Sequence, residues 1–203
     1  MSSRCGQNLF GNDPMEMFKK YLADYRDNWF LKHLDNWIRG KDLVLDLGAG
    51  NSCMGQLLEK YHDCRVLNLE VAQYQTHNTL PLVIYNGRDI PFKDGSFDVV
   101  LILFVLHHAD EPAQVLKEAK RICRRSVIVF EDYIESWHDL LHFRIFHVLL
   151  ACSKTLTLPR HELDMEQMSQ LAKEAGFNEL WKRPVERQLG FISPRHVIYR
   201  WDV

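Results

Sequence analysis

Three acidic residues, Asp46, Glu70 and Asp89, follow or end apolar runs that have the length of strands. The first run, Leu43 to Leu47, is continuously apolar apart from Asp46, as in a strand buried on both faces of a parallel sheet. Because parallel strands end at one edge of a sheet, the three carboxylates are expected to gather there, where ligands bind. They would repel a pyrophosphate but suit a cationic ligand that is rich in amino and hydroxyl donors.

The segment Gly48-Ala49-Gly50-Asn51-Ser52 follows the first run, and a helical pattern begins directly after it. Glycines at 48 and 50 allow the backbone to turn sharply and allow a ligand to approach it closely. Glu70 follows this turn by about 20 residues, at the end of the second strand. An acid at that spacing is placed to accept hydrogen bonds from ribose hydroxyls.

These residues resemble motif I of the class I S-adenosylmethionine (SAM)-dependent methyltransferases, a hydrophobic residue followed by Asp-x-Gly-x-Gly. The run from Asn86 to Val100 resembles a second motif of that family, Gly-Asp-Ala-x-x-Leu-Pro-Phe-x-Asp-x-Ser-Phe-Asp-x-Val, shortened by about two residues. The resemblance extends from about residue 15 to the C-terminus, with the specific motifs between 43 and 110. It implies SAM as cofactor and methyl transfer as the reaction.

The resemblance also assigns roles along the cofactor. Asp89 would bind the exocyclic amine of adenine, with the Ile90 amide near a ring nitrogen, and Arg88 is an alternative for part of that contact. Backbone groups of Leu103 and Phe104 would contact the methionine end. The cofactor-binding residues expected in full are Asp46, Gly48, Ala49, Gly50, Ser52, Glu70, Asp89, Ile90, Leu103 and Phe104.

Two residues are candidates for handling a proton of the methyl acceptor. His107 follows the fourth strand, in Leu106-His107-His108, and it could line the pocket or cap the next helix. Glu131 follows the fifth strand, and Asp132 beside it is an equal candidate. Methyl transfer from a sulfonium needs mainly alignment and exclusion of water, and a general base helps only where the acceptor carries a proton to be removed. We therefore expect His107 and Glu131 as the catalytic residues and no metal.

Two helical segments are expected to border the acceptor. A segment at about 14–40 carries an apolar stripe and would form an N-terminal cap, with Tyr25 and Trp29 facing the substrate. A second segment at about 133–158 resembles the lid of related methyltransferases, and His138 and Arg144 are its expected substrate contacts. His142 and His147 are further polar residues on that segment.

The order of patterns predicts one α/β domain over residues 1–203, a Rossmann-like open sheet of about seven strands with helices on both faces. The family resemblance implies the strand order 3-2-1-4-5-7-6 with the last strand antiparallel. Strands are expected at 43–47, 64–69, 82–85, 97–103, 127–130, 178–182 and 196–201. Asp110 is expected to cap the helix after the fourth strand, and Asp164 with Gln167 a later helix.

Composition narrows the class of protein. The chain of 203 residues has a formal net charge of −2, which gives no global attraction to nucleic acid or to an anionic membrane. Its five cysteines include no Cys-x-x-Cys pair, and charged residues interrupt the longest apolar stretch. We therefore expect a cytoplasmic protein with neither zinc ribbon nor membrane span.

Three functions compete. A SAM-dependent methyltransferase with a small-molecule acceptor is preferred, although a protein or RNA acceptor stays open. A non-catalytic SAM-binding protein that acts as a binding or regulatory partner is the main alternative. A nicotinamide-dependent oxidoreductase is disfavoured, because its fingerprint requires a third glycine where this chain has Cys53.

Overall fold

A computed structural model describes residues 29–34, 36–73, 80–151, 159–178, 180–185 and 194–203. Seven strands form one mixed sheet in the order β3-β2-β1-β4-β5-β7-β6. The strands are β1 (Leu43–Leu47), β2 (Arg65–Glu70), β3 (Leu82–Ile84), β4 (Phe97–Leu103), β5 (Cys123–Tyr133), β6 (Leu180–Val185) and β7 (Arg195–Asp202). The first five are parallel, while β7 is antiparallel to both β5 and β6. The predicted order and direction are confirmed.

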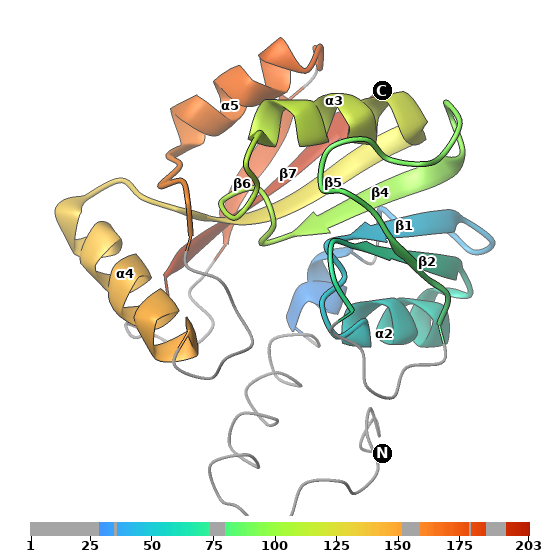
Figure 1. Ribbon diagram of the computed structural model, residues 1–203, viewed down its shortest axis with the longest axis horizontal. Coiled ribbons are helices and arrows are strands. Elements are labelled where there is room, and N and C mark those ends of the chain that lie inside the picture. Colours follow the sequence, from blue (N-terminus) through green and yellow to red (C-terminus); the bar gives the residue numbers. More distant parts are fainter. Residues whose placement is uncertain (1–28, 35, 74–79, 152–158, 179, 186–193) are drawn as a thin grey trace, which may run out of the picture.

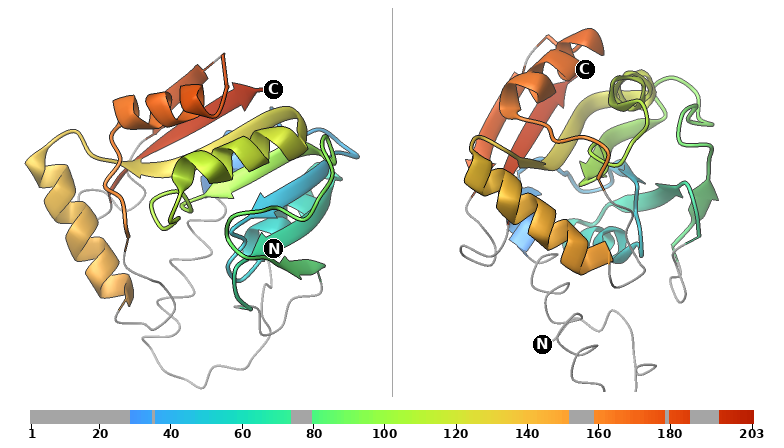
Figure 2. Two further views of the ribbon diagram at one scale, coloured as in Figure 1. Left: turned by 45° about the horizontal axis from the view of Figure 1, so that its top comes forward. Right: turned by 60° about the vertical axis from the view of Figure 1, so that its left-hand side comes forward.

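Helices cover both faces of the sheet (Figures 1 and 2). The helices of the described residues are α2 (Cys53–His62), α3 (Pro112–Ile122), α4 (Trp137–Ala151) and α5 (Met165–Glu174), and residues 29–34 are also helical. The apolar faces of α3 and α5 pack on one side of the sheet, and those of α2 and residues 29–34 on the other. Neighbouring strand residues point to opposite faces, so Val100 and Ile102 join the first core while Val99 and Leu101 join the second.

Helix α4 lies apart from this packing. Figure 1 and the left view of Figure 2 show it beyond the ends of β4 and β5, away from α2, α3 and α5. No helix in the described part of the chain is both long and apolar enough to cross a membrane.

Two local predictions were wrong. Asp110 does not cap α3, whose N-cap is Glu111 with no side-chain cap bond; Asp110 pairs with Arg160 instead. Strand β5 begins at Cys123, directly after α3, and extends to Tyr133, because antiparallel pairing with β7 continues as far as Arg195. Glu131 and Asp132 therefore lie inside the strand rather than after it.

The capping box of α5 was predicted correctly. Asp164 accepts hydrogen bonds from the amides of Glu166 and Gln167, and the Gln167 side chain accepts one from the Asp164 amide. The N-terminal half of the predicted cap, including Tyr25, lies outside the described residues. So does the end of the predicted lid.

Candidate active site

The glycine turn after β1 meets the end of β2. The amides of Gly48 and Ala49 both donate to the Leu69 carbonyl, at 2.8 and 3.3 Å. Gly48 and Gly50 have φ angles of +76° and +52°, in the left-handed region that glycine adopts without strain. The two glycines differ in their surroundings. A methyl group added to Gly48 would come within 2.3 Å of Val105, whereas one added to Gly50 would meet no atom within 4 Å.

Glu70 closes this turn with its side chain. One carboxylate oxygen accepts a hydrogen bond from the Gly50 amide at 2.9 Å, and the other from the Val71 amide at 2.7 Å. Asp46 lies on the neighbouring strand, where it is almost fully buried. Two acids therefore border a glycine turn that has open space at Gly50, as expected for a site that holds a ribose and a positively charged group.

Tyr85, which the sequence did not single out, belongs to the same edge. Its amide donates to the Glu70 carbonyl at 3.0 Å. Burial, and then the nearby Glu70 charge, raise the pKa of the Tyr85 phenol to about 12. The phenol is therefore neutral at pH 7 and lies close enough to Glu70 for its charge to act on it. A tyrosine directly after the third strand was the available signal.

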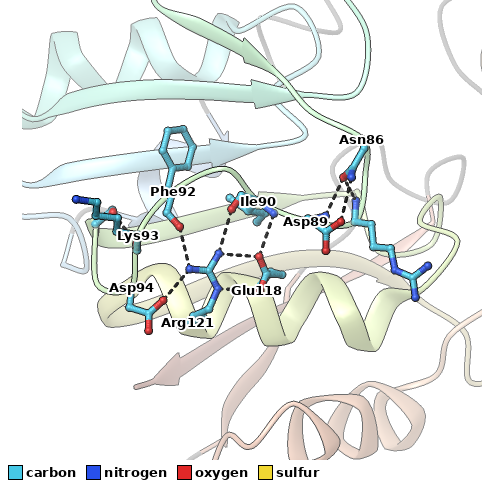
Figure 3. Close-up of polar contacts among 10 residues, drawn as sticks. Asn86, Asp89, Ile90, Phe92, Lys93, Asp94, Glu118 and Arg121 are labelled. Carbon is cyan, nitrogen blue, oxygen red and sulfur yellow. Dashed lines mark hydrogen bonds and ion pairs between the residues drawn. The ribbon is translucent and has the colours of Figure 1, made fainter.

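The loop after β3 is fastened to α3 (Figure 3). Arg121 donates to the carbonyls of Ile90 and Phe92 and pairs with Asp94 and Glu118. These hydrogen bonds fix the position of the loop backbone relative to α3.

The predicted adenine contacts lie in this loop. Asp89 is exposed and accepts a hydrogen bond from the Asn86 side chain at 3.1 Å. The Ile90 amide donates to Glu118 at 3.0 Å, so it would have to give up that hydrogen bond to reach a ligand (Figure 3). Asn86, nearer to the end of β3, also accepts from the amides of Arg88 and Asp89. No role was predicted for Asn86 from the sequence.

The remaining residues that were predicted to bind the cofactor lie near β1 and β4. Ser52 is fully buried and precedes α2, and Phe104 follows β4 with a φ of +56°. The Phe104 amide donates to the Phe130 carbonyl at 2.8 Å. Leu103 is the last residue of β4, so both positions lie at the carboxyl end of this strand.

His107 and Glu131 form a buried pair at the same edge. The Nδ1 atom of His107 lies 2.5 Å from one Glu131 oxygen, and the other oxygen accepts a hydrogen bond from the Leu106 amide at 2.7 Å. Burial alone lowers the pKa of His107, but the charge and hydrogen bond of Glu131 outweigh it, so the pKa of His107 is raised. The two residues predicted as catalytic are thus in direct contact.

A second carboxylate–histidine pair adjoins the first. Asp132 accepts a hydrogen bond from His196 of β7 at 2.7 Å. His147 of α4 lies between the pairs, with its Nε2 atom 3.3 Å from Nε2 of His107 and 3.8 Å from Asp132. The five side chains form a continuous buried polar network that the sequence analysis did not foresee.

Of the residues predicted to contact the substrate, one lies at the buried network and two are exposed. The ring of Trp29 lies 6.0 Å from that of His196, so Trp29 reaches the network. His138 and Arg144 are exposed; His138 stacks on Trp137, and Arg144 pairs with Glu162. On α4 it is His147, rather than His138 or Arg144, that reaches His107.

The comparisons with known proteins agree with this geometry. A family described as a methyltransferase domain matches residues 45–130, which include the glycine turn, Glu70, His107 and the end of β4. An uncharacterised protein of Methanocaldococcus jannaschii is 30% identical over 177 residues, covering 82% of this chain and 83% of that protein. The 27-O-demethylrifamycin SV methyltransferase of Amycolatopsis mediterranei is 25% identical over 99 residues, 43% of this chain and 36% of that enzyme.

A solved structure from Thermotoga maritima has the same fold. It is described as a SAM-dependent methyltransferase and possible histamine N-methyltransferase, and it superposes with a TM-score of 0.68. The two share 16% identity, and the match covers 93% of this chain and 95% of that one. The Thermotoga structure thus shares the fold, and the matched methyltransferase domain identifies the chain as a member of the SAM-dependent methyltransferase family, with SAM as its cofactor.

Proposed function

We propose that this protein transfers the methyl group of SAM to a small-molecule acceptor. The observation that carries the proposal is the buried Glu70 carboxylate, fixed by the Gly50 and Val71 amides at the end of β2. A carboxylate held there can accept hydrogen bonds from both hydroxyls of a ribose. SAM, when bound, supplies a methyl group on a sulfonium, whose departure as a neutral thioether makes the displacement favourable.

The cofactor side is assigned residue by residue. Gly48, Ala49, Gly50 and Ser52 would surround the amino-acid part and the ribose, and Asp46 would hold positive charge. The open space beside Gly50 fits a ligand that lies against the backbone. Leu103 and Phe104 would border the methionine end, and Asp89 with Ile90 is proposed for the adenine.

The acceptor side is assigned to His107 and Glu131. Glu131 accepts the Nδ1 proton of His107, which leaves Nε2 of a neutral ring as the atom that can take up a proton from an acceptor hydroxyl or ammonium group. The surroundings are buried and rich in aromatic rings, with Phe143 5.8 Å from the His107 ring. Buried surroundings of this kind suit a small acceptor better than a folded protein or an RNA duplex.

The similarity to a named enzyme also supports a small-molecule acceptor. The matched enzyme of Amycolatopsis mediterranei is named for a rifamycin derivative, which is a small molecule. His138, Arg144, Tyr25 and Trp29 stay proposed as substrate contacts; of these, Trp29 has the strongest support, through its approach to His196.

The experiment that tests the proposal is mass spectrometry of a metabolite extract incubated with the purified full chain and methyl-labelled SAM. We expect a small-molecule product that gains one labelled methyl group, and no such product with Asp46→Ala. A thermal shift with SAM but no labelled product in small-molecule, protein or RNA fractions would instead favour a non-catalytic SAM-binding protein. Label in the protein or RNA fraction would overturn the proposed class of acceptor.

A further inference from the structure

Three imidazole rings from two separate segments meet at the carboxyl ends of β4 and β5. His107 and His108 follow β4, and His147 comes from α4. One nitrogen from each ring lies within 4.8 Å of the others. His107 and His147 are buried and His108 is half-buried. No metal site was predicted from the sequence, in which His107 and His147 are 40 positions apart.

The hydrogen bonds on the far side of two rings fix their tautomers. Nδ1 of His107 faces a Glu131 oxygen at 2.5 Å, and Nδ1 of His147 faces the Phe143 carbonyl at 2.9 Å. A carboxylate and a carbonyl only accept hydrogen bonds, so each Nδ1 carries a hydrogen. In the neutral rings the lone pairs are therefore on the two Nε2 atoms.

These two Nε2 atoms lie 3.3 Å apart. Two lone pairs at that separation repel each other unless a cation lies between them. A metal ion with tetrahedral geometry and bonds to nitrogen of about 2.0–2.1 Å places its ligand atoms about 3.4 Å from one another. The observed separation matches this spacing.

The groups around the rings also suit a cation. Imidazoles that bind metals commonly donate their other N–H to a carboxylate or a backbone carbonyl, which orients the ring and raises its basicity. His107 donates to a carboxylate, that of Glu131, and His147 donates to a backbone carbonyl, that of Phe143. Asp132 adds a buried carboxylate 3.8 Å from Nε2 of His147, so the cluster has negative charge close by.

We propose that His107, His108 and His147 bind a divalent transition-metal ion, and that Zn²⁺ is the ion that suits three imidazole ligands best. Three protein ligands leave a fourth position, which an acceptor hydroxyl or thiol could occupy. A zinc ion lowers the pKa of such a group, and this would replace the role of His107 as a base. That consequence rests on the proposed function, whereas the binding of the metal does not.

The competing occupant is a proton. The raised pKa of His107 favours a protonated ring that donates from Nε2 to His147. A metal ion would displace this proton, so the two occupants give different results when metal is added.

The test is isothermal titration of the chelator-treated full chain with ZnCl₂, together with the visible spectrum after addition of Co²⁺. We expect one metal ion per chain and the absorption bands of tetrahedral Co²⁺. His147→Ala and His108→Ala should each weaken Zn²⁺ binding by at least about 10-fold. His108 is only half-buried, so its replacement tests the site even if His147→Ala fails to fold.

His138→Ala is the matched control, because His138 is an exposed histidine on the same helix. It should leave zinc affinity unchanged. Absence of zinc binding, or equal affinity in the wild type, His108→Ala and His147→Ala, would overturn the proposal and leave a shared proton as the occupant. Because the readout is metal binding, failure to find a methyl acceptor would not affect it.

Discussion

The Glu131 carboxylate lies 2.5 Å from Nδ1 of His107 and simultaneously accepts the Leu106 amide, with both side chains buried. Glu131 therefore determines the tautomer of His107, with the hydrogen on Nδ1 and the lone pair of the neutral ring on Nε2. This relationship holds whether Nε2 takes a proton or binds a metal ion.

We expect Glu131→Gln to reverse the tautomer of His107. Glutamine can still accept the Leu106 amide with its oxygen, but its amide group then faces Nδ1 as a donor. The His107 hydrogen would move to Nε2, which removes the lone pair from the site. Zinc affinity should fall by about 10- to 100-fold, the usual effect of losing a carboxylate that orients a metal-binding histidine.

Two measurements check this prediction. Nitrogen NMR of the His107 ring reports the tautomer directly, and titration with ZnCl₂ reports the affinity. SAM affinity should be unchanged, because among the described residues Glu131 bonds to Leu106 and His107 rather than to the glycine turn. An unaltered tautomer in Glu131→Gln would mean that Glu131 does not set it.

Glu70→Gln should weaken SAM binding, and because its NH2 group faces one of the two backbone amides that Glu70 accepts, thermal unfolding must show that the variant still folds. A neutral amide loses the charge-assisted hydrogen bonds to the ribose, each of which contributes about 1.5–3 kcal/mol, so we expect affinity to fall by roughly 10- to 100-fold. Titration calorimetry with SAM or with its demethylated product measures the change without an acceptor.

Glu59→Gln is the control for this experiment. Glu59 also accepts a backbone amide, that of Val66, but it lies on α2 away from the glycine turn. It should retain wild-type affinity. Equal affinities in the two variants would rule out Glu70 as the ribose ligand.

Alanine substitutions at Gly48 and Gly50 should have different effects. Both residues have positive φ, so each substitution introduces about 1–2 kcal/mol of backbone strain. At Gly48 the new methyl group also collides with Val105, so this variant should unfold at a distinctly lower temperature.

At Gly50 the methyl group enters open space, so the loss should fall mainly on SAM affinity. Thermal unfolding with and without SAM separates the two effects. If Gly50→Ala bound SAM as tightly as the wild type, the space beside Gly50 would not be the cofactor site.

Local sequence rules predicted the parts of the fold that depend on neighbours in the chain. The capping box of Asp164 and Gln167 is one example, because both partners lie within one helical turn. The strand that contains Asp46 is another, because a short, almost continuously apolar run before a glycine turn is typical of a buried parallel strand. The order of the strands came from the family resemblance.

Contacts between distant segments were not predictable in this way. His147 meets His107 only because α4 lies beyond the ends of β4 and β5, and no periodicity within residues 137–151 distinguishes His147 from His138. Asp110 has the composition of a helix cap, but an ion pair with Arg160 from a remote segment takes its side chain. His107 and Glu131 were predicted as catalytic because the sequence placed both after strands, although Glu131 lies inside β5. The network around them required the tertiary structure.

The pair of Asp42 and Arg125 should make the stability of the protein depend on acid. Burial alone would raise the pKa of Asp42, but hydrogen bonds from the Arg125 side chain and the Arg39 amide outweigh it and lower the pKa below its usual value. A carboxyl with a lowered pKa in the folded state contributes stability above its unfolded pKa of about 3.9, and this contribution is lost as the pH falls through the folded value.

At pH 7, Asp42→Asn should lower the free energy of unfolding by about 2 kcal/mol, which corresponds to roughly 4–8 °C in Tm. As the pH falls below about 3.9, the difference between the variant and the wild type should shrink. Glu162→Gln, which breaks an exposed pair with Arg144, should change stability by less than about 1 kcal/mol at any pH. Thermal unfolding of the three proteins between pH 2 and pH 7 measures these differences, and a gap between Asp42→Asn and the wild type that stays constant across that range would show that the Asp42 charge does not stabilise the fold.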